Sequence, residues 1–312
     1  MPGDILIIKL GALGDLVQAL GPMAAIRAHH REARITLLTT APFEAFMAAS
    51  GLVDDIWVDS RPSLINVAGW MGLRRRLRDG GFARVYDLQT SDRSAWYFRL
   101  FGRAGRPEWS GVAPGCSHPH ANPDRDSMHT LERQREQLSM AGIASVPAPS
   151  LDWVPGELKD KDPGGPYAVV APGGAAHRPD KRWPGENFAD LAGRLAAAGL
   201  RPVFVGGPED RVLTGGLAAR VTGALDLGGR TSLLELAGLC RGAALAVGND
   251  TGPMHMAAVA GAPSLVLYSH DSDPALCAQR GRRVEILRCP DLRTLDPEDA
   301  ARAAAALRGG GP

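Results

Sequence analysis

Short apolar runs alternate with longer amphipathic segments along almost the whole chain. Such runs are typical of strands buried on both faces of a parallel sheet, and their alternation with helical patterns is typical of βαβ units. The predicted fold class is therefore α/β. In the first half, the pattern predicts strands at 4–10, 34–40, 54–59 and 83–89 and helices at 16–29, 42–50, 64–79 and 128–142.

A proline- and glycine-rich stretch at 144–166 interrupts the alternation, as an interdomain linker would. The 312 residues, 45% of them hydrophobic, are enough to fill two cores. We therefore predict one domain at 1–150 and a second at 151–312. In the second, the pattern predicts strands at 167–173, 201–207, 225–229, 245–250 and 263–269 and helices at 186–198, 209–221, 233–243, 252–261 and 296–310.

Charge and cysteine content exclude some classes of protein. The 35 basic and 34 acidic residues give a formal net charge of +1, which argues against a nucleic-acid partner held by charge. Cys116, Cys240, Cys277 and Cys289 form no C-x-x-C pair, which indicates a reducing compartment rather than disulfides or zinc. The sequence shows no membrane-spanning run and no secretion signal. We expect a cytoplasmic protein that at most touches the inner face of the cytoplasmic membrane.

In open α/β sheets, ligands bind beyond the carboxyl ends of the strands, so the residues after each strand are informative. GALGD follows the first strand. Gly11 and Gly14 lack the G-x-G-x-x-G spacing of a dinucleotide site, and Asp15 would repel a pyrophosphate. Asp15 is either an N-cap of a helix that begins near Leu16 or a general base in a cleft. The two roles compete, because capping would make the carboxylate a poor proton acceptor.

Two segments of the second half suit a ligand that carries phosphates. Gly173 and Gly174 permit close approach of the backbone and Lys181 offers a mobile positive charge, although an ordinary solvated loop explains the same residues. After the next strand, Glu209 or Asp210 can accept hydrogen bonds from ribose hydroxyls, or can simply start a helix.

The segment AVGNDTGPMHMAA is the most specific of these sites. A strand leads into Asp250, Thr251 and Gly252, and Pro253 stands where a helix would begin. Backbone amides and the Thr251 hydroxyl build an anion site at that helix N-terminus, with His255 one turn further on unless its role is only structural. The second half therefore fits a nucleotide diphosphate.

IIKLGALGD, APGGAAHRPDKRWP and VGNDTGPMHMAAVAGAPSLVLY resemble, in order and separation, the signature segments of glycosyltransferase family 9, the ADP-heptose:lipopolysaccharide heptosyltransferases. The resemblance extends over about the whole chain. It implies a GT-B architecture, in which two Rossmann-like domains with parallel sheets face a central cleft. The first domain would bind mainly the acceptor and the second the nucleotide sugar, and the C-terminal helix would be able to pack back on the first domain.

The resemblance also implies an activity. Family enzymes transfer heptose from ADP-heptose to the lipopolysaccharide inner core, with inversion and without a metal or other cofactor. In such a displacement even a weakly basic carboxylate can take the acceptor proton late, while Lys181 and the amides around Thr251 stabilise the leaving diphosphate. The implied catalytic residues are Asp15 and Lys181; the implied donor site is Gly173, Lys181, Glu209 or alternatively Asp210, Asp250, Thr251, Gly252 and His255; the acceptor candidates are Gly14 and Arg93.

One segment departs from the family. Many members have F-G-P-T-x-P after the donor site, where this chain has YSHDSDPALCAQRG. His270, Asp271 and Asp273 are therefore either specificity elements for the donor sugar or a drifted loop. The basic run 74–78 is either a solvated helix face or a site for the phosphates of an acceptor or of an anionic leaflet. The motif GCSHPH at 115–120 matches no closed zinc pattern.

Two rival functions remain open. A GT-B-fold transferase, epimerase or hydrolase acting on another nucleotide sugar is the first; an epimerase or hydrolase would need further acid and base groups. A non-catalytic nucleotide-sugar-binding protein is the second, and in such a protein Asp15 would be dispensable.

Overall fold

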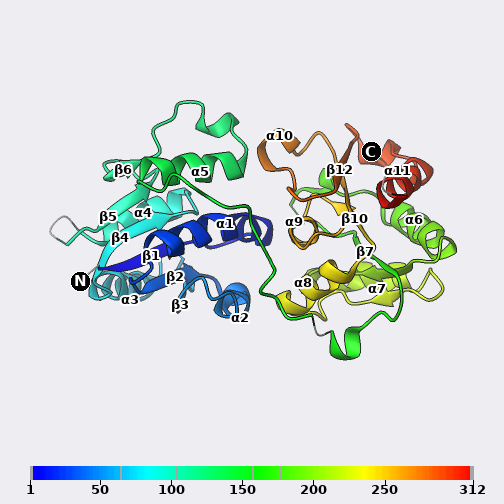
Figure 1. Ribbon diagram of the computed structural model, residues 1–312, viewed down its shortest axis with the longest axis horizontal. Coiled ribbons are helices and arrows are strands. Elements are labelled where there is room, and N and C mark those ends of the chain that lie inside the picture. Colours follow the sequence, from blue (N-terminus) through cyan, green and yellow to red (C-terminus); the bar gives the residue numbers. More distant parts are fainter. Residues whose placement is uncertain (1–2, 64, 103–104, 157, 176, 310–312) are drawn as a thin grey trace. The chain divides into compact units, whose positions relative to one another are not determined.

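The computed structural model describes residues 3–63, 65–102, 105–156, 158–175 and 177–309. The chain divides into two compact units, Met1–Pro149 and Ser150–Pro312, each with its own sheet and hydrophobic core (Figure 1). Among the described helices, none is both long and apolar enough to cross a bilayer.

The first unit is built on a parallel sheet with the strand order β3-β2-β1-β4-β5-β6. The apolar run at the start of the chain forms the central strand, in which Ile5–Ile8 are all buried because neighbouring elements cover both faces. The strands are β1 (Asp4–Ile8), β2 (Ile35–Thr39), β3 (Asp55–Val58), β4 (Phe82–Asp87), β5 (Glu108–Gly111) and β6 (His118–Pro119), and the α-helices are α1 (Leu13–His29), α2 (Glu44–Ala48), α3 (Val67–Asp79), α4 (Asp92–Leu100) and α5 (Thr130–Met140).

The second unit has a parallel sheet with the strand order β12-β11-β10-β7-β8-β9. Its central strands are again continuous apolar runs and are wholly buried. The strands are β7 (Tyr167–Ala171), β8 (Arg201–Phe204), β9 (Leu225–Asp226), β10 (Leu245–Asn249), β11 (Ser264–Tyr268) and β12 (Val284–Arg288), and the α-helices are α6 (Gly185–Ala197), α7 (Arg211–Ala218), α8 (Leu233–Gly242), α9 (Gly252–Val259), α10 (Pro274–Cys277) and α11 (Pro297–Gly309).

The two sheets share one topology. Numbered within its own unit, each reads 3-2-1-4-5-6, the order of a dinucleotide-binding Rossmann sheet. The order reverses between the first and fourth strands, and ligands bind at the carboxyl ends of the strands at such a switch point. Those ends belong to β1 and β4 in the first unit and to β7 and β10 in the second. The predicted α/β fold class with parallel sheets is confirmed.

Several boundaries differ from the sequence prediction. The first helix begins at Leu13 rather than near Leu16. Five further elements, β5, β6, β12, α4 and α10, were not predicted. The C-terminal helix α11 packs against α6 and buries Ala300 and Ala304 in the core of the second unit.

Candidate functional site

Asn249 joins the chain segments that meet at the switch point of the second unit. It is the last residue of β10 and is fully buried. Its side-chain amide donates to the carbonyls of Pro172 at 2.9 Å and Gly173 at 3.1 Å, and its carbonyl accepts from the Trp183 N–H at 3.0 Å. The ends of β7 and β10 and the start of α6 are therefore held together by one side chain.

Asp250 lies at the centre of a polar cluster just beyond β10. Its carboxylate accepts from Lys181 Nζ at 2.6 Å, Ser272 Oγ at 2.6 Å and Gln279 Nε2 at 2.9 Å, and the Tyr268 hydroxyl lies 3.0 Å away. Burial by itself would raise the pKa of Asp250, but hydrogen bonds from Lys181 and Ser272 hold the pKa below its ordinary value. The carboxylate is therefore ionised, and it fixes the ammonium of Lys181 at the mouth of the switch point.

Thr251 is the N-cap of α9, and Pro253 lies in the first turn as the sequence predicts. The Thr251 hydroxyl is buried and has no hydrogen-bond partner among the described residues. A buried hydroxyl beside first-turn amides is suited to a phosphate oxygen, because the amides and the helix dipole both favour an anion. His255 is buried on the same helix, with Nε2 3.9 Å from Asp250 Oδ1. The structure thus brings together Gly173, Lys181, Asp250, Thr251, Gly252 and His255.

The two acids proposed for a ribose differ in their surroundings. Asp210 is buried, and its Oδ2 accepts from the Gly207 N–H at 3.0 Å. A Cβ atom on Gly173 would lie only 2.5 Å from the Asp210 carboxylate, so this glycine is needed for close packing. Burial raises the pKa of Asp210. The Glu209 carboxylate packs in a similar way against Gly207, where a Cβ atom would lie 2.5 Å from it, but Glu209 is exposed, so of the pair it is better placed to meet a ligand hydroxyl.

In the first unit, Asp15 lies in the third position of α1, inside the first turn, and Ala12 is the N-cap. The predicted N-cap position is therefore wrong, because the helix begins earlier. The carboxylate nevertheless reaches back and accepts from the Ala12 N–H at 3.1 Å. At the turn after β1, Gly11 has a φ of 122°, a backbone conformation that glycine adopts much more readily than other residues. Gly14 is buried in the same first turn.

A cavity of about 180 Å³ opens beside Asp15 within the first unit. Lys9, Arg125 and Arg133 bring positive charge to its wall, and burial lowers the pKa of Lys9, against the opposing effect of Asp15 and Asp87. None of these three cations was predicted as a site residue from the sequence. Lys9 was visible as a charge at the end of a buried strand, whereas the arginines come from a distant segment. The lining residues are Lys9, Asp15, Leu88, Gln89, Thr90, Arg125, Thr130, Arg133, Gln134 and Gln137.

Arg125 is held toward this cavity by the histidine that ends the GCSHPH motif. Arg125 Nε donates to His120 Nδ1 at 3.1 Å, and its Nη2 donates to the Thr90 hydroxyl at 2.7 Å. His120 Nε2 lies 2.9 Å from Glu136 Oε2. Because Nδ1 accepts a hydrogen bond, the imidazole proton is on Nε2, and this N–H donates a hydrogen bond to Glu136. The motif therefore positions an arginine and does not ligate a metal through this ring.

Arg93, an acceptor candidate from the sequence, packs within the first unit. It lies in the first turn of α4, and its guanidinium donates to the Pro62 carbonyl at 3.3 Å and lies 5.4 Å from the centre of the Trp70 ring. These contacts tie α4 to α3 and the loop before it. The cavity wall is built by other residues, so an acceptor role for Arg93 stays a prediction.

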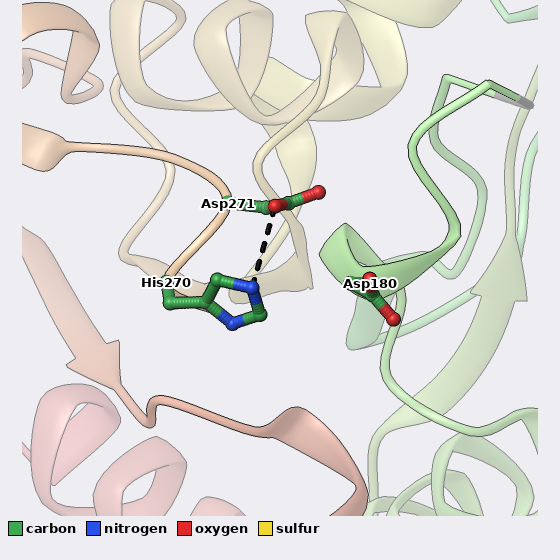
Figure 2. Close-up of side chains that lie close together, drawn as sticks. All are labelled: Asp180, His270 and Asp271. Atoms are coloured by element: carbon green, nitrogen blue, oxygen red, sulfur yellow. Dashed lines mark ion pairs between the residues drawn. The ribbon is translucent and has the colours of Figure 1, made fainter.

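The loop after β11, where the chain departs from the family pattern, is tied to the Lys181 cluster through Ser272. Figure 2 shows His270 and Asp271 on this loop opposite Asp180. Each of the three offers one nitrogen or oxygen atom that could bind a metal, and these atoms lie within 4.8 Å of one another. Two carboxylates and an imidazole form a set that divalent cations bind. Asp180 and His270 are exposed, however, and Asp271 pairs with Arg178, with Nε and Oδ2 3.9 Å apart.

Comparison with known proteins places the chain in one group. A family model described as Glycosyltransferase family 9 (heptosyltransferase) matches residues 70–295. The chain is 27% identical to lipopolysaccharide heptosyltransferase 1 of Pseudomonas aeruginosa over 293 residues, which cover 89% of this chain and 81% of that protein. It is 29% identical to lipopolysaccharide heptosyltransferase 2 of Salmonella typhimurium, over 86% of this chain and 83% of that protein.

Solved structures show the same fold. ADP-heptose lipopolysaccharide heptosyltransferase II of E. coli superposes with a TM-score of 0.81 at 21% identity, covering 98% of both chains. E. coli heptosyltransferase WaaC with ADP superposes with a TM-score of 0.77 at 22% identity, covering 97% of this chain and 99% of that one. The architecture is therefore a GT-B fold, as the sequence resemblance implied.

Proposed function

Since the chain belongs to glycosyltransferase family 9, we propose that it transfers a heptose from ADP-heptose to an inner-core acceptor of lipopolysaccharide. Transfer inverts the anomeric centre and needs no metal or other cofactor. The names of the relatives support the reaction, since they are lipopolysaccharide heptosyltransferases, and the E. coli WaaC structure that contains ADP supports the nucleotide.

The second unit, residues 150–312, is the donor-binding domain in this proposal. The diphosphate lies at the N-terminus of α9, where the buried Thr251 hydroxyl lacks a partner among the described residues. Lys181 supplies positive charge that compensates the negative charge of the diphosphate. Asp250 holds Lys181 in place and does not contact the phosphate, which its own charge would repel. Glu209 accepts from the ribose, and His255 completes the site one turn into the helix.

The first unit, residues 1–149, is the acceptor-binding domain. Its cavity combines one carboxylate, Asp15, with Lys9, Arg125 and Arg133. A cationic wall is suited to the anionic groups of a lipopolysaccharide core, because charge-assisted hydrogen bonds to carboxylate or phosphate are the strong ones. Gly14 lets the acceptor approach the backbone beside Asp15.

The chemistry then follows from two charges. The acceptor oxygen bonds to the anomeric carbon as the bond from that carbon to the diphosphate oxygen breaks, and the acceptor proton passes to Asp15. One Asp15 oxygen is occupied by the Ala12 N–H, and we assign the other to this proton. Lys181 and the α9 amides stabilise the negative charge that grows on the departing ADP.

One observation supports the proposal: the two sheets share a topology, and one switch point holds an acid with cations while the other holds Lys181 and a buried Thr251 hydroxyl that has no partner among the described residues. The test is Asp15→Asn, assayed for heptose transfer to a truncated lipopolysaccharide core and for ADP binding. We expect transfer to fall by about 10² to 10⁴, as for loss of a general base, with ADP affinity unchanged.

The matched control is Glu44→Gln, which removes an exposed acid from the first turn of α2. It should leave transfer unchanged. Full activity in Asp15→Asn would remove Asp15 from the reaction and would favour a binding protein or a different base. Binding of only non-ADP nucleotide sugars would overturn the donor assignment, and sugar release without an acceptor would indicate a hydrolase.

A further inference from the structure

One face of α3 combines exposed apolar and basic side chains. Val67, Met71, Arg74, Arg75 and Arg78 follow one another at helical spacing and are all exposed. Ile65, just before the helix, is 91% exposed, and Val67 and Met71 are 65% and 66% exposed. We call these six residues the α3 face.

The core does not account for this face. The opposite side of α3 packs inward through Leu77, which is buried, and through Trp70 and Leu73, which are partly buried against the first unit's core. Single exposed hydrophobic residues are ordinary. Here, however, three of the six large hydrophobic side chains that are exposed in the described chain fall within seven consecutive positions. Such clustering marks an interaction surface.

Among the described residues, Asp79 is the one acid that lines the same hollow as the arginines of the α3 face. Arg74, Arg75 and Arg78 line a surface hollow of about 400 Å³ together with Met71 and Asp79, which contributes one negative charge. Arg76, by contrast, lies over the Trp57 ring, 4.3 Å from its centre, and belongs to the packing of the unit. Three guanidinium groups around one hollow match an array of phosphates, since the planar guanidinium binds phosphate oxygens in pairs.

We propose that the α3 face binds the surface of an anionic phospholipid bilayer. Ile65, Val67 and Met71 enter the boundary between headgroups and acyl chains, while the arginines pair with headgroup phosphates. A helix with apolar residues beside arginines on one exposed face is the pattern of an interfacial helix. Because the net charge of the chain is only +1, the attraction is local to this face.

The place of α3 in the fold gives the contact a purpose. The helix starts shortly after β3, so its apolar N-terminal end lies on the edge of the sheet where β1 and β4 also end. The cavity beside Asp15 opens at that same edge. Docking through Ile65, Val67 and Met71 would bring the cavity to a lipid-anchored acceptor at the bilayer surface. This purpose, though not the lipid binding itself, rests on the proposed function.

The test measures binding of the full-length protein to vesicles by flotation. Wild type should bind mixed phosphatidylglycerol and phosphatidylcholine vesicles, bind vesicles of phosphatidylcholine alone much more weakly, and lose binding in high salt, which screens charges beyond about 3 Å at 1 M. The triple variant R74Q/R75Q/R78Q should bind about a hundredfold more weakly, since each arginine near an anionic surface contributes roughly fivefold. The double variant V67S/M71S should also bind more weakly, at unchanged charge.

R220Q/R282Q/R288Q is the matched control, because it removes three exposed arginines from the second unit. It should bind as wild type does. Equal losses of vesicle binding in the two triple variants would mean that only net charge matters, which would overturn the proposal. Full vesicle binding by R74Q/R75Q/R78Q would overturn it as well.

Turnover separates this inference from the proposed function. R74Q/R75Q/R78Q should transfer normally to a soluble, delipidated core oligosaccharide and poorly to lipopolysaccharide embedded in anionic vesicles. Vesicle binding without any heptose transfer would contradict the proposed function but support lipid binding by the α3 face. Equal transfer by wild type and variant to the embedded acceptor would reject the purpose of docking.

Discussion

Lys9 and Asp87 put opposite charges into the interior of the first unit, next to the acid on which the proposed reaction depends. Burial raises the pKa of Asp87 to about 6, and burial lowers the pKa of Lys9. Each shift means that the fold disfavours the charged form of that side chain. Lys9 donates to the Leu88 carbonyl at 3.1 Å, and Asp87 accepts from the Thr90 N–H at 2.9 Å, so these hydrogen bonds help to hold the segment after β4 that lines the cavity.

His120 provides the sharpest residue-scale prediction, because it acts only through Arg125. His120→Ala removes the acceptor of the Arg125 Nε–H and leaves the guanidinium bonded to the Thr90 hydroxyl and to the Asp126 carboxylate. Loss of a hydrogen bond to a charged group costs about 1.5–3 kcal/mol, so we expect KM for the acceptor to rise at least about tenfold. ADP affinity and kcat at saturating acceptor should stay near wild type.

His118→Ala is the control, since this neighbouring histidine of the same motif lies 2.9 Å from Ser117 Oγ rather than near Arg125. It should leave the acceptor KM unchanged. A fall in kcat with an unchanged acceptor KM in His120→Ala would contradict a positioning role. A parallel loss of ADP binding would indicate general unfolding instead.

At this scale, the sequence revealed residues that follow a strand directly. Asp15, Lys181 and Thr251 were recognisable because a buried apolar run precedes each segment and because the segments resemble family motifs. Arg125 and Arg133 were not recognisable, since they reach the cavity from a polar stretch and a helix more than 100 residues away from Asp15. They come together because α5 packs against α1 in the folded unit.

At the scale of elements, the same reasoning explains which helices and strands were predicted. Central strands such as β1 and β10 are continuous apolar runs because both faces are covered, and the pattern identified them. The strand β5 has the sequence EWSG and the edge strand β6 has the sequence HP, so neither contains the apolar run by which other strands were predicted. Helix α4, with the sequence DRSAWYFRL, was missed because it begins directly after a polar turn and three of its nine residues are charged.

Asn249 gives the prediction at this scale, because its side chain joins three element ends. Asn249→Ala leaves the Trp183 N–H and the carbonyls of Pro172 and Gly173 without their buried partner. Unsatisfied buried groups cost about 1–3 kcal/mol each, so we expect the second unit to lose about 3 kcal/mol or more of unfolding free energy. ADP binding should weaken with it, because Gly173 and the α9 N-terminus are no longer held together.

Asn249→Asp separates the two halves of this effect. It keeps an acceptor for the Trp183 N–H but replaces the donor to the two carbonyls with a buried acid. Denaturant unfolding, followed with and without ADP, should give this variant a lower unfolding midpoint than wild type. If Asn249→Ala unfolded at the wild-type midpoint, the linking role of this side chain would be excluded.

At the scale of the whole molecule, the chain repeats one topology with different chemistry at each switch point. Two domains were predictable from chain length and from the proline-rich stretch, and the resemblance supplied the GT-B fold. The shared 3-2-1-4-5-6 order was not predictable, because periodicity identifies strands without saying which of them are neighbours. That order is what turns a set of separate motifs into two sites.

If the second unit binds the donor and the first the acceptor, each ligand should protect a different unit from hydrogen exchange in the full-length protein. ADP alone should slow exchange in the second unit, around 172–174, 181–183 and 250–256, because the diphosphate satisfies groups at the ends of β7 and β10. A delipidated core oligosaccharide should slow exchange in the first unit, around 9–16, 88–92 and 125–137. Asp15→Asn should keep the ADP pattern, since that residue belongs to the other unit's site. Protection of 9–16 by ADP, with no change around 250–256, would mean that the first unit binds the donor and the second the acceptor. Asp15 would then lie beside the nucleotide, where its negative charge opposes a diphosphate.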